Sequence, residues 1–501
     1  MKTLMQLRTY LLSIIRIFGL YHIPLISAIL IIYMGFGSGY TWNYDPVPFE
    51  KSNYFDFLAE AFLKGNLDIN VPKATLDMSP YKGHIYLYWG PLNALPQMFI
   101  RLFIPYKVSM CLLTVIYCFI GIIFFACILR YLNNLFFTGE RKWIESYFIC
   151  TIACGSPLFF IATRSSSFHH QNIGLSFLAQ MLTILTFLWV AKSGSRKAII
   201  VFSLGIVLAL GVRLTNLFLL PGILIGAYIL SSKPRLRNFI TRYWLPMILI
   251  TFTIGGLLLY NKARFENPFE TGMRYQTGNI EQRKLLYEHS AMISLRWLPT
   301  NFKLYFLLLP RFNDGFPKFE QLKYVPIPDS LKELYPPEKP FVTDLSSVIF
   351  MTPLISLFLL LIIVRPEPMQ IKLCYSFGLS VLGIISFLLC FAGASLRYSV
   401  DFIPLMLLLS FIATQHYLKN NPKYERLFRS LFMFLLLWST IIFWQFAKHG
   451  ARKVLSILIL VKDMPLTNPA WAYILGLILT IALFFELYIL ELRLYKSVNK
   501  F

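Results

Sequence analysis

Long apolar runs separated by short polar connections dominate the chain. Runs of about 18 or more apolar residues are long enough to cross a bilayer as helices. A further stretch, 198–231, is too long for one span and is interrupted by Arg213 and Asn216, so it predicts two short helices. Since a helix pairs its own backbone groups inside hydrocarbon, we predict an all-α polytopic membrane protein with about twelve spans. The other spans are expected near residues 18–38, 107–131, 145–162, 171–191, 240–260, 346–364, 371–392, 398–417, 428–446 and 469–491.

The composition agrees with one membrane domain over residues 1–501. The chain is 57% hydrophobic and 14% charged. Its first apolar run is longer than the core of a signal peptide, and no Ala-x-Ala cleavage site follows it, so we expect it to remain as an anchor.

Short basic clusters produce the net charge of +23. With twelve spans and a cytoplasmic N-terminus, every cluster falls on the cytoplasmic side, as positively charged loops usually do. This predicts an inner-membrane protein with both termini in the cytoplasm. A nucleic-acid partner is not expected, because such binding needs a continuous basic surface with accessible aromatics. The clusters are Lys2, Arg8 and Arg16; Arg130, Arg141 and Lys142; Lys192, Arg196 and Lys197; Lys233, Arg235, Arg237 and Arg242; Arg365 and Lys372; Lys419, Lys423, Arg426 and Arg429; and Arg493, Lys496 and Lys500.

The same topology places two large inserts, 39–106 and 261–345, on the extracytoplasmic side. The first contains a helix-like segment at 52–65, whose apolar stripe predicts an amphipathic surface helix. The second combines a polar stretch, a semi-apolar piece and a Pro-rich stretch that predicts irregular structure. The first insert also gathers the carboxylates Asp45, Glu50, Asp56, Asp68 and Asp77.

Charged residues also occur at the outer ends of spans, where burial is costly. Arg164, Arg213, Arg397 and Asp401 all reach this side. We expect them to line a shared polar cavity. Two simpler interpretations stay open: each arginine extends to the lipid headgroups, or Arg397 and Asp401 pair at spacing i, i+4 on one helix face.

His169 and His170 open the fourth helix after a run of serines. Neighbouring helical side chains point about 100° apart, so at most one of them faces a given site. Capping or hydrogen bonding at the membrane surface is the alternative role. The seven cysteines lie within predicted spans and show no metal-ligand spacing. The sequence therefore indicates no metal site.

Several phrases together resemble a known superfamily. FLAEAFLKGNL and YKGHIYLYWGPLNALP in the first insert, YNKARFENPFETGMRYQ (260–276) and SLRYSVDFIPLML (395–407) are similar to the GT-C integral-membrane glycosyltransferases. That group includes protein mannosyltransferases and lipid A aminoarabinose transferases, and the chain most resembles bacterial members of unassigned substrate. The resemblance spans most of the chain and implies a long first outer loop with an acidic catalytic residue near its start. The usual Asp–Glu pair is absent, which leaves Asp45, Glu50 and Asp56 as equal candidates.

The resemblance implies a sugar transfer at the outer membrane face. A polyprenyl-phosphate sugar would be the donor, and an envelope glycan, lipid or protein the acceptor. A carboxylate would take the proton of the acceptor hydroxyl during inverting attack, and cations would meet the phosphate leaving group. Some members use a divalent metal, for which this chain has no clear carboxylate set. The expected phosphate- and donor-binding residues are Lys82, Arg164, His169, His170, Arg213 and Arg397.

Two other classes remain open. A transporter or flippase of lipid-linked sugars would also have many spans, but should place polar or helix-breaking residues in paired positions at mid-membrane. Such residues occur here mainly at the outer edge. A non-catalytic envelope protein with the same fold is the third interpretation.

Overall fold

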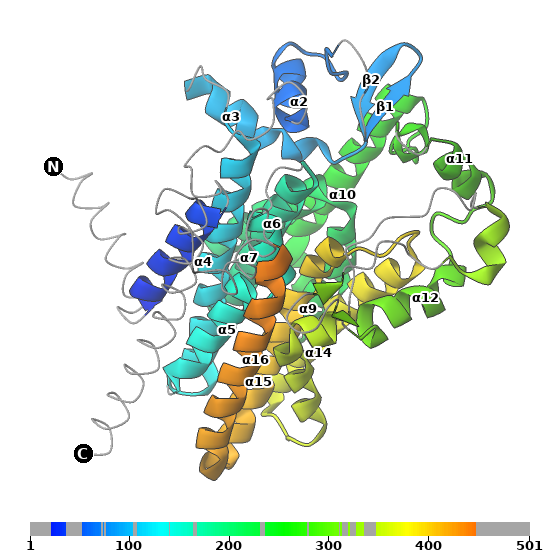
Figure 1. The fold of residues 1–501 in the computed structure, drawn as a ribbon. Coiled ribbons are helices and arrows are strands. Elements are labelled where there is room, and N and C mark those ends of the chain that lie inside the picture. The colour runs from blue at the N-terminus through cyan, green and yellow to red at the C-terminus, as the bar shows by residue number, and fades with distance from the viewer. Residues whose placement is uncertain are drawn as a thin grey trace.

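Helices make up most of the structure, a computed structural model (Figure 1). The first predicted span is present as a helix over His22–Phe36. The last predicted span, 469–491, lies outside the described residues. Those residues are 22–36, 53–71, 74, 77–103, 108–139, 141–163, 168–230, 236–277, 280–309, 311–312, 319–320, 327–334 and 347–446.

Five helices in this part of the chain are long and apolar enough to cross a membrane. They are Met110–Phe136 (α4), Phe168–Ser193 (α7), Phe239–Phe265 within α10 (Leu236–Phe265), Pro368–Cys390 (α14) and Pro422–Trp444 across η10 (Pro422–Tyr424) and α16 (Glu425–Phe446). The bent pair α5 (Lys142–Cys154) and α6 (Pro157–Thr163) raises the number to six. The all-α membrane class agrees with the prediction, whereas the count of twelve is not confirmed.

Several predicted spans are short or broken at identifiable residues. The 198–231 stretch divides as expected: α8 (Arg196–Val212) ends where Arg213 adopts an extended backbone, and η3 (Leu214–Leu219) and α9 (Leu220–Ile229) follow. The α5–α6 pair bends by 51°. Pro157 begins α6, where its missing N–H costs nothing. The spans near 346–364 and 398–417 become α13 (Val348–Met351) with η8 (Pro353–Ile362), and η9 (Leu396–Asp401) with α15 (Ile403–Asn420).

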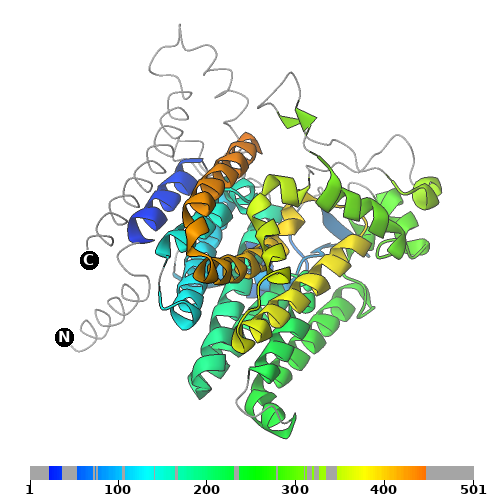
Figure 2. The same cartoon turned by 90° about the horizontal axis from the view of Figure 1, so that it is seen from below.

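Small residues allow the helices to approach closely. Gly222 and Gly226 of α9 face Ser376 and Ser380 of α14, and a Cβ on Gly222 would lie 2.3 Å from the Ser380 hydroxyl. Ser376 donates to the Gly222 carbonyl over 2.9 Å. Such small polar contacts hold apolar helices together where lipid removes the hydrophobic driving force. Helix α10 is peripheral and lies at the rim of the bundle in Figure 2. Of its most apolar 18-residue stretch, 11% is buried, compared with 78% for the corresponding stretch of α7.

The first insert forms a cap over one end of the bundle (top of Figure 1). The expected amphipathic helix is α2 (Tyr54–Leu63), and its buried face packs against a hairpin of β1 (Met78–Tyr81) and β2 (His84–Leu87). The hairpin was not predicted. Its turn, Lys82–Gly83, has φ of 48° and 84°, the left-handed pair that a two-residue hairpin turn requires. The segment η2 (Pro91–Asn93) and helix α3 (Leu95–Phe103) then lead into α4.

The second insert packs beside the cap and against the end of α14. Asn301 donates to the carbonyls of Leu388, Leu389 and Phe391 over 2.9–3.2 Å. Thr277 donates to the Met78 carbonyl over 2.8 Å, which joins this insert to the hairpin of the first. Its elements are η4 (Met273–Tyr275), α11 (Ile280–Glu288), η5 (Leu295–Trp297), α12 (Leu298–Phe302), η6 (Lys303–Leu307), β3 (Arg311–Phe312), β4 (Phe319–Glu320) and η7 (Asp329–Leu334).

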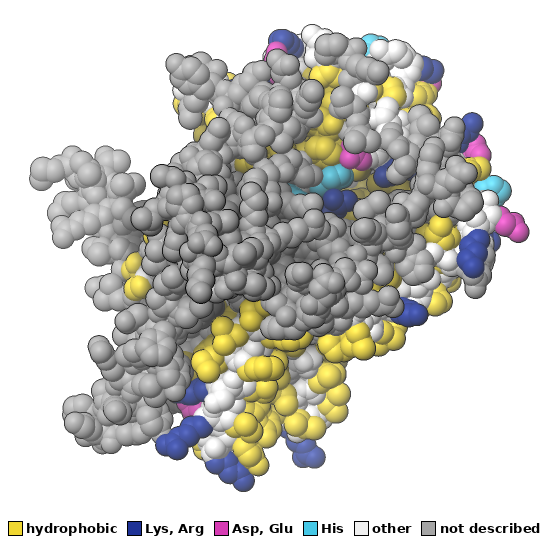
Figure 3. Space-filling model, viewed as in Figure 1, with side chains coloured by type: hydrophobic (Ala, Val, Ile, Leu, Met, Phe, Trp, Pro, Cys, Tyr) yellow, Lys and Arg dark blue, Asp and Glu magenta, His cyan; other side chains and the backbone are white. Residues whose placement is uncertain are grey.

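A buried polar cluster lies toward the end of the bundle away from the cap. The Glu145 carboxylate is fully buried and contacts His22 Nε2 at 2.7 Å and Arg130 Nη1 at 3.1 Å. It also accepts from Asn133, which in turn accepts from Gln415 over 3.3 Å. The cluster joins the first described helix to α4, α5 and α15. Basic side chains gather around the lower end of the bundle (Figure 3), as the sorting of the basic clusters predicts.

Glu145→Ala would leave a buried guanidinium and amide without their shared acceptor. We expect the free energy of unfolding to fall by about 3–5 kcal/mol, measured by thermal unfolding of detergent-solubilised protein. Lys419→Gln is the matched control, because the Lys419–Glu367 pair at 3.0 Å is half exposed and should cost about 0–1 kcal/mol. Equal stability of the two variants would contradict a stabilising role for the cluster.

Candidate functional site

Asp77 and His169 meet where the cap adjoins the start of α7. The Asp77 Oδ2 atom lies 3.1 Å from His169 Nε2, and both side chains are about one-fifth exposed. Asp77 has a φ of 69°, a left-handed conformation that aspartate tolerates better than most residues. Its backbone N–H donates to the Thr277 carbonyl over 3.3 Å. Both inserts therefore hold this carboxylate against the helical bundle.

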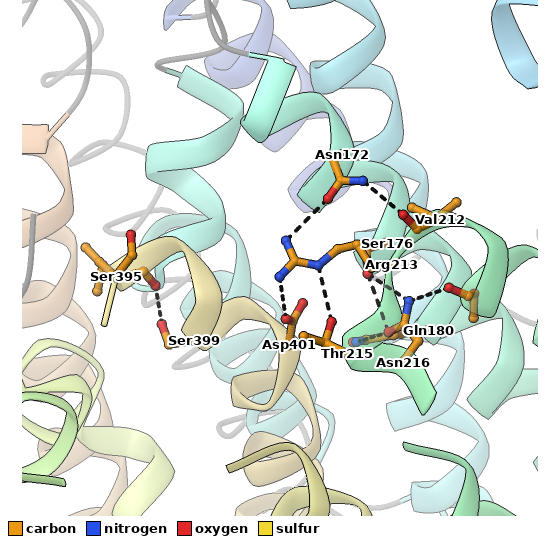
Figure 4. A network of polar contacts seen from close by, with 12 residues as sticks. Asn172, Ser176, Gln180, Val212, Arg213, Thr215, Asn216, Ser395, Ser399 and Asp401 are labelled. Carbon is orange, nitrogen blue, oxygen red and sulfur yellow. Dashed lines mark hydrogen bonds and ion pairs between the residues drawn. The ribbon is translucent and has the colours of Figure 1, made fainter. Parts of the chain in front are cut away.

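Arg213 is held at the end of α8 by three side chains (Figure 4). Its Nη2 donates to Asp401 over 2.9 Å, its Nε to Thr215 over 3.2 Å and its Nη1 to Asn172 over 3.4 Å. Asp401 is 1% exposed and Arg213 12% exposed. Asp401 thus pairs with Arg213 and not with Arg397, so the interpretation of an i, i+4 pair on one helix face is wrong. The reason is that residues 396–401 form a 3-10 turn before α15.

Arg397 lies beside this pair, and the described part of the chain supplies no carboxylate to it. Its guanidinium carbon is 5.5 Å from the centroid of the Tyr398 ring, and that of Arg213 is 5.6 Å from the same centroid. Among the described residues no acid forms an ion pair with Arg397, and its buried Nε has no hydrogen-bond partner there. Both arginines interact electrostatically with His169. Arg213, Arg397, His169 and Asp77 therefore form one group of ionisable side chains. Figure 3 shows acidic, basic and histidine side chains around a recess below the cap.

Aromatic side chains of the cap surround the start of α7. Trp89 stacks on Tyr88 at a centroid distance of 4.0 Å and contacts His169 edge-on at 5.3 Å. Phe168 stacks on Tyr54 at 4.4 Å. Burial and then the Asp77 charge raise the pKa of Tyr88 far above its ordinary value. The Tyr88 hydroxyl therefore stays protonated and can donate a hydrogen bond at neutral pH.

Two further predicted site residues, Asp56 and Lys82, lie away from this group. Asp56 is 2% exposed, and its two oxygens accept from Arg101 Nε over 2.9 Å and Nη2 over 2.6 Å. This bidentate pair joins α2 to α3. Lys82 is at the exposed hairpin turn, where its 2.5 Å contact with Glu266 raises the pKa of the ammonium group. Asp45, Glu50 and Arg164 lie outside the described residues.

The two histidines diverge as helical geometry predicts. His169 contacts Asp77, whereas His170 is 5% exposed and contacts Phe160 edge-on at a centroid distance of 5.1 Å. Sequence reasoning did not assign a site role to Asp77 or Tyr88. The hairpin that carries the residues between them could have been predicted, because two short runs with aromatic residues, 78–81 and 84–87, flank the two-residue turn Lys82–Gly83. Across the described ranges, no three His, Cys, Asp or Glu side chains are arranged to hold a metal ion.

Comparisons with known proteins add little to this geometry. No family model and no curated protein matches the sequence. Among solved structures, the chain is similar to the oligosaccharyltransferase of Archaeoglobus fulgidus in its apo form, with a TM-score of 0.41 and 10% sequence identity. That similarity covers 89% of this chain and 59% of the oligosaccharyltransferase, so the chain spans less than two thirds of that protein's length.

Asp401→Ala would leave Arg213 buried with no carboxylate. We expect the free energy of unfolding to fall by about 3–5 kcal/mol, whereas removing both charges in Arg213→Met/Asp401→Leu should cost less than either single change. Thermal unfolding of the single and double variants measures this coupling. Additive losses would show that the two side chains do not stabilise each other.

Proposed function

We propose that the chain is a membrane glycosyltransferase of the GT-C kind. It would move a sugar from a polyprenyl-phosphate donor to a glycan, lipid or protein of the cell envelope, with inversion. The capped end would face the extracytoplasmic side of the inner membrane, and both termini the cytoplasm. The observation that supports this most is the half-buried Arg397, without a carboxylate partner in the described chain, beside Arg213 and Asp77 at the end of apolar helices.

Phosphate recognition is the first step of the proposal. Arginine has five N–H donors in a planar fork, and Arg213 uses three of them within the protein. Two N–H groups of Arg213 and the guanidinium of Arg397 remain for a phosphate, whose geometry suits such donors. An isoprenoid phosphate would enter from the bilayer with its tail among apolar helices and its headgroup at this recess.

The transfer step needs a base beside these cations. The carboxylate would take the hydroxyl proton while the acceptor oxygen attacks the anomeric carbon. The bond from that carbon to the phosphate oxygen would break, and the polyprenyl phosphate would leave with the electron pair. Among the described carboxylates of the first insert, Asp77 suits this role because it adjoins His169, whereas both oxygens of Asp56 accept from Arg101. Asp45 and Glu50 remain predicted bases.

A flippase of lipid-linked sugars is the second candidate function. The buried Glu145–His22–Arg130 cluster supports it, because ionisable groups inside a helical bundle often line a transport path. The two functions differ in where a lipid-linked sugar would collect when the protein is absent. A missing transferase leaves it on the outer leaflet, and a missing flippase leaves it on the inner leaflet.

We expect a deletion strain to lose one envelope glycan and to accumulate its lipid-linked sugar, exposed to glycosidase added to spheroplasts. Complementation with Arg397→Gln or Asp77→Asn should restore glycan formation at least about 100-fold less well than the wild type, as loss of transition-state charge stabilisation does. Mass spectrometry of extracted glycans and lipids measures both products.

Lys64→Gln is the control variant, because Lys64 is 60% exposed and pairs with Glu60 one helical turn away. It should complement fully. Accumulation that is protected from external glycosidase would favour the flippase. An unchanged glycan profile with no accumulated lipid would contradict both functions and favour a non-catalytic envelope protein.

A further inference from the structure

The turn between β2 and α3 sits directly on the end of α8. A Cβ on Gly90 would lie 2.1 Å from the Gly211 carbonyl oxygen and 2.8 Å from that of Val212. A Cβ on Gly211 would lie 2.3 Å from the Leu92 side chain. Both glycines are therefore needed for this approach, since any side chain would push the two segments apart. The first insert is in this way seated on the helix that ends beside Arg213.

Two buried asparagines complete this seat. Asn93 Nδ2 donates to the carbonyls of Gly90 and Val212, each over 2.9 Å. Asn172 Nδ2 donates to Asn93 Oδ1 over 2.9 Å and to the Val212 carbonyl over 3.1 Å. The Val212 carbonyl is at the last residue of α8, where helical carbonyls lack a partner within the helix. The asparagines supply that partner.

The other end of the Asn172 amide faces Arg213. Its Oδ1 accepts from Arg213 Nη1 over 3.4 Å, as Figure 4 shows. The orientation of this amide is determined by its surroundings. If it were reversed, its oxygen would face two other oxygens, those of Asn93 and Val212, and its NH2 group would face a guanidinium. One side chain therefore connects the seat of the first insert to the cation.

We propose that Asn172 is a positioning residue that couples the seating of the first insert to the placement of the Arg213 guanidinium for an anionic lipid headgroup. The inference rests on the proposed function, because it takes Arg213 as a phosphate ligand. Asn172 acts through Arg213 and does not itself contact the phosphate. One group of hydrogen bonds therefore positions two parts of the site: the insert that would carry the base and the cation that would hold the donor.

A double-mutant cycle tests this coupling in the full chain in lipid nanodiscs, with undecaprenyl phosphate as the probe and native mass spectrometry as the readout. We expect Arg213→Gln to weaken binding about tenfold, in line with loss of one charge-assisted contact. Asn172→Ala should weaken binding by a similar factor, because the Arg213 guanidinium is then no longer held in place. The double variant should bind no more weakly than Arg213→Gln alone, because Asn172 acts only through Arg213. Additive losses, or normal binding by Asn172→Ala, would overturn the inference.

Three further variants complete the experiment. Ser376→Ala removes an equally buried polar side chain at the contact between α9 and α14 and should leave the probe affinity within about twofold of the wild type, although it lowers stability. If Asn172→Ala does not fold, Asn172→Ser and Asn93→Ala weaken the same link and replace it in the cycle.

Arg397→Gln reports on the proposed function separately, since Arg397 has no contact with Asn172 among the described residues. Loss of binding in Arg397→Gln with normal binding in Asn172→Ala would leave the function standing and overturn the coupling. A wild type without saturable binding, or an Arg397→Gln variant that binds as tightly as the wild type, would contradict the phosphate site and with it the coupling.

Discussion

The buried ion pair between Arg213 and Asp401 is the interaction on which the capped end of the bundle depends. An isolated charge at this depth would cost several kcal/mol, so each partner makes the other tolerable. Their 2.9 Å contact joins the end of α8 to the turn that precedes α15, two segments far apart in sequence. Asn172 and Thr215 then determine the plane of the guanidinium. Asn172 also donates to Asn93 of the first insert, so the same side chain connects this insert to the ion pair.

The neighbouring Arg397 carries a positive charge that the Arg213–Asp401 ion pair does not neutralise. Asp401 neutralises Arg213, and within the described part of the chain no acid does the same for Arg397. A cationic surplus at the edge of an apolar bundle is stable if water or an anion reaches it. The proposed phosphate ligand is the anion whose geometry and lipid tail suit this place.

The local pattern predicted several elements correctly. The amphipathic α2, the break of the 198–231 stretch at Arg213 and the divergence of His169 from His170 all follow from periodicity and helical geometry. Other features depend on contacts between distant segments. Asp56 is on the polar face of α2 by pattern, yet it is buried because Arg101 of α3 reaches it. The Asp77–His169 contact joins residues 92 positions apart, which no local pattern reveals.

The sequence by itself determined the class of the protein. Long apolar runs and basic connections dictate a helical membrane protein, because lipid leaves the backbone few alternatives. The sequence also identified charged residues at the ends of apolar runs, such as Arg213, Arg397 and Asp401, which need an ionic partner or water. Only the tertiary structure decided which charge each one meets. Asp401 could pair with Arg397 on its own turn or with Arg213 across the bundle, and the choice depends on the backbone between residues 396 and 401, which forms a 3-10 turn. That choice leaves Arg397 without an acidic partner among the described residues.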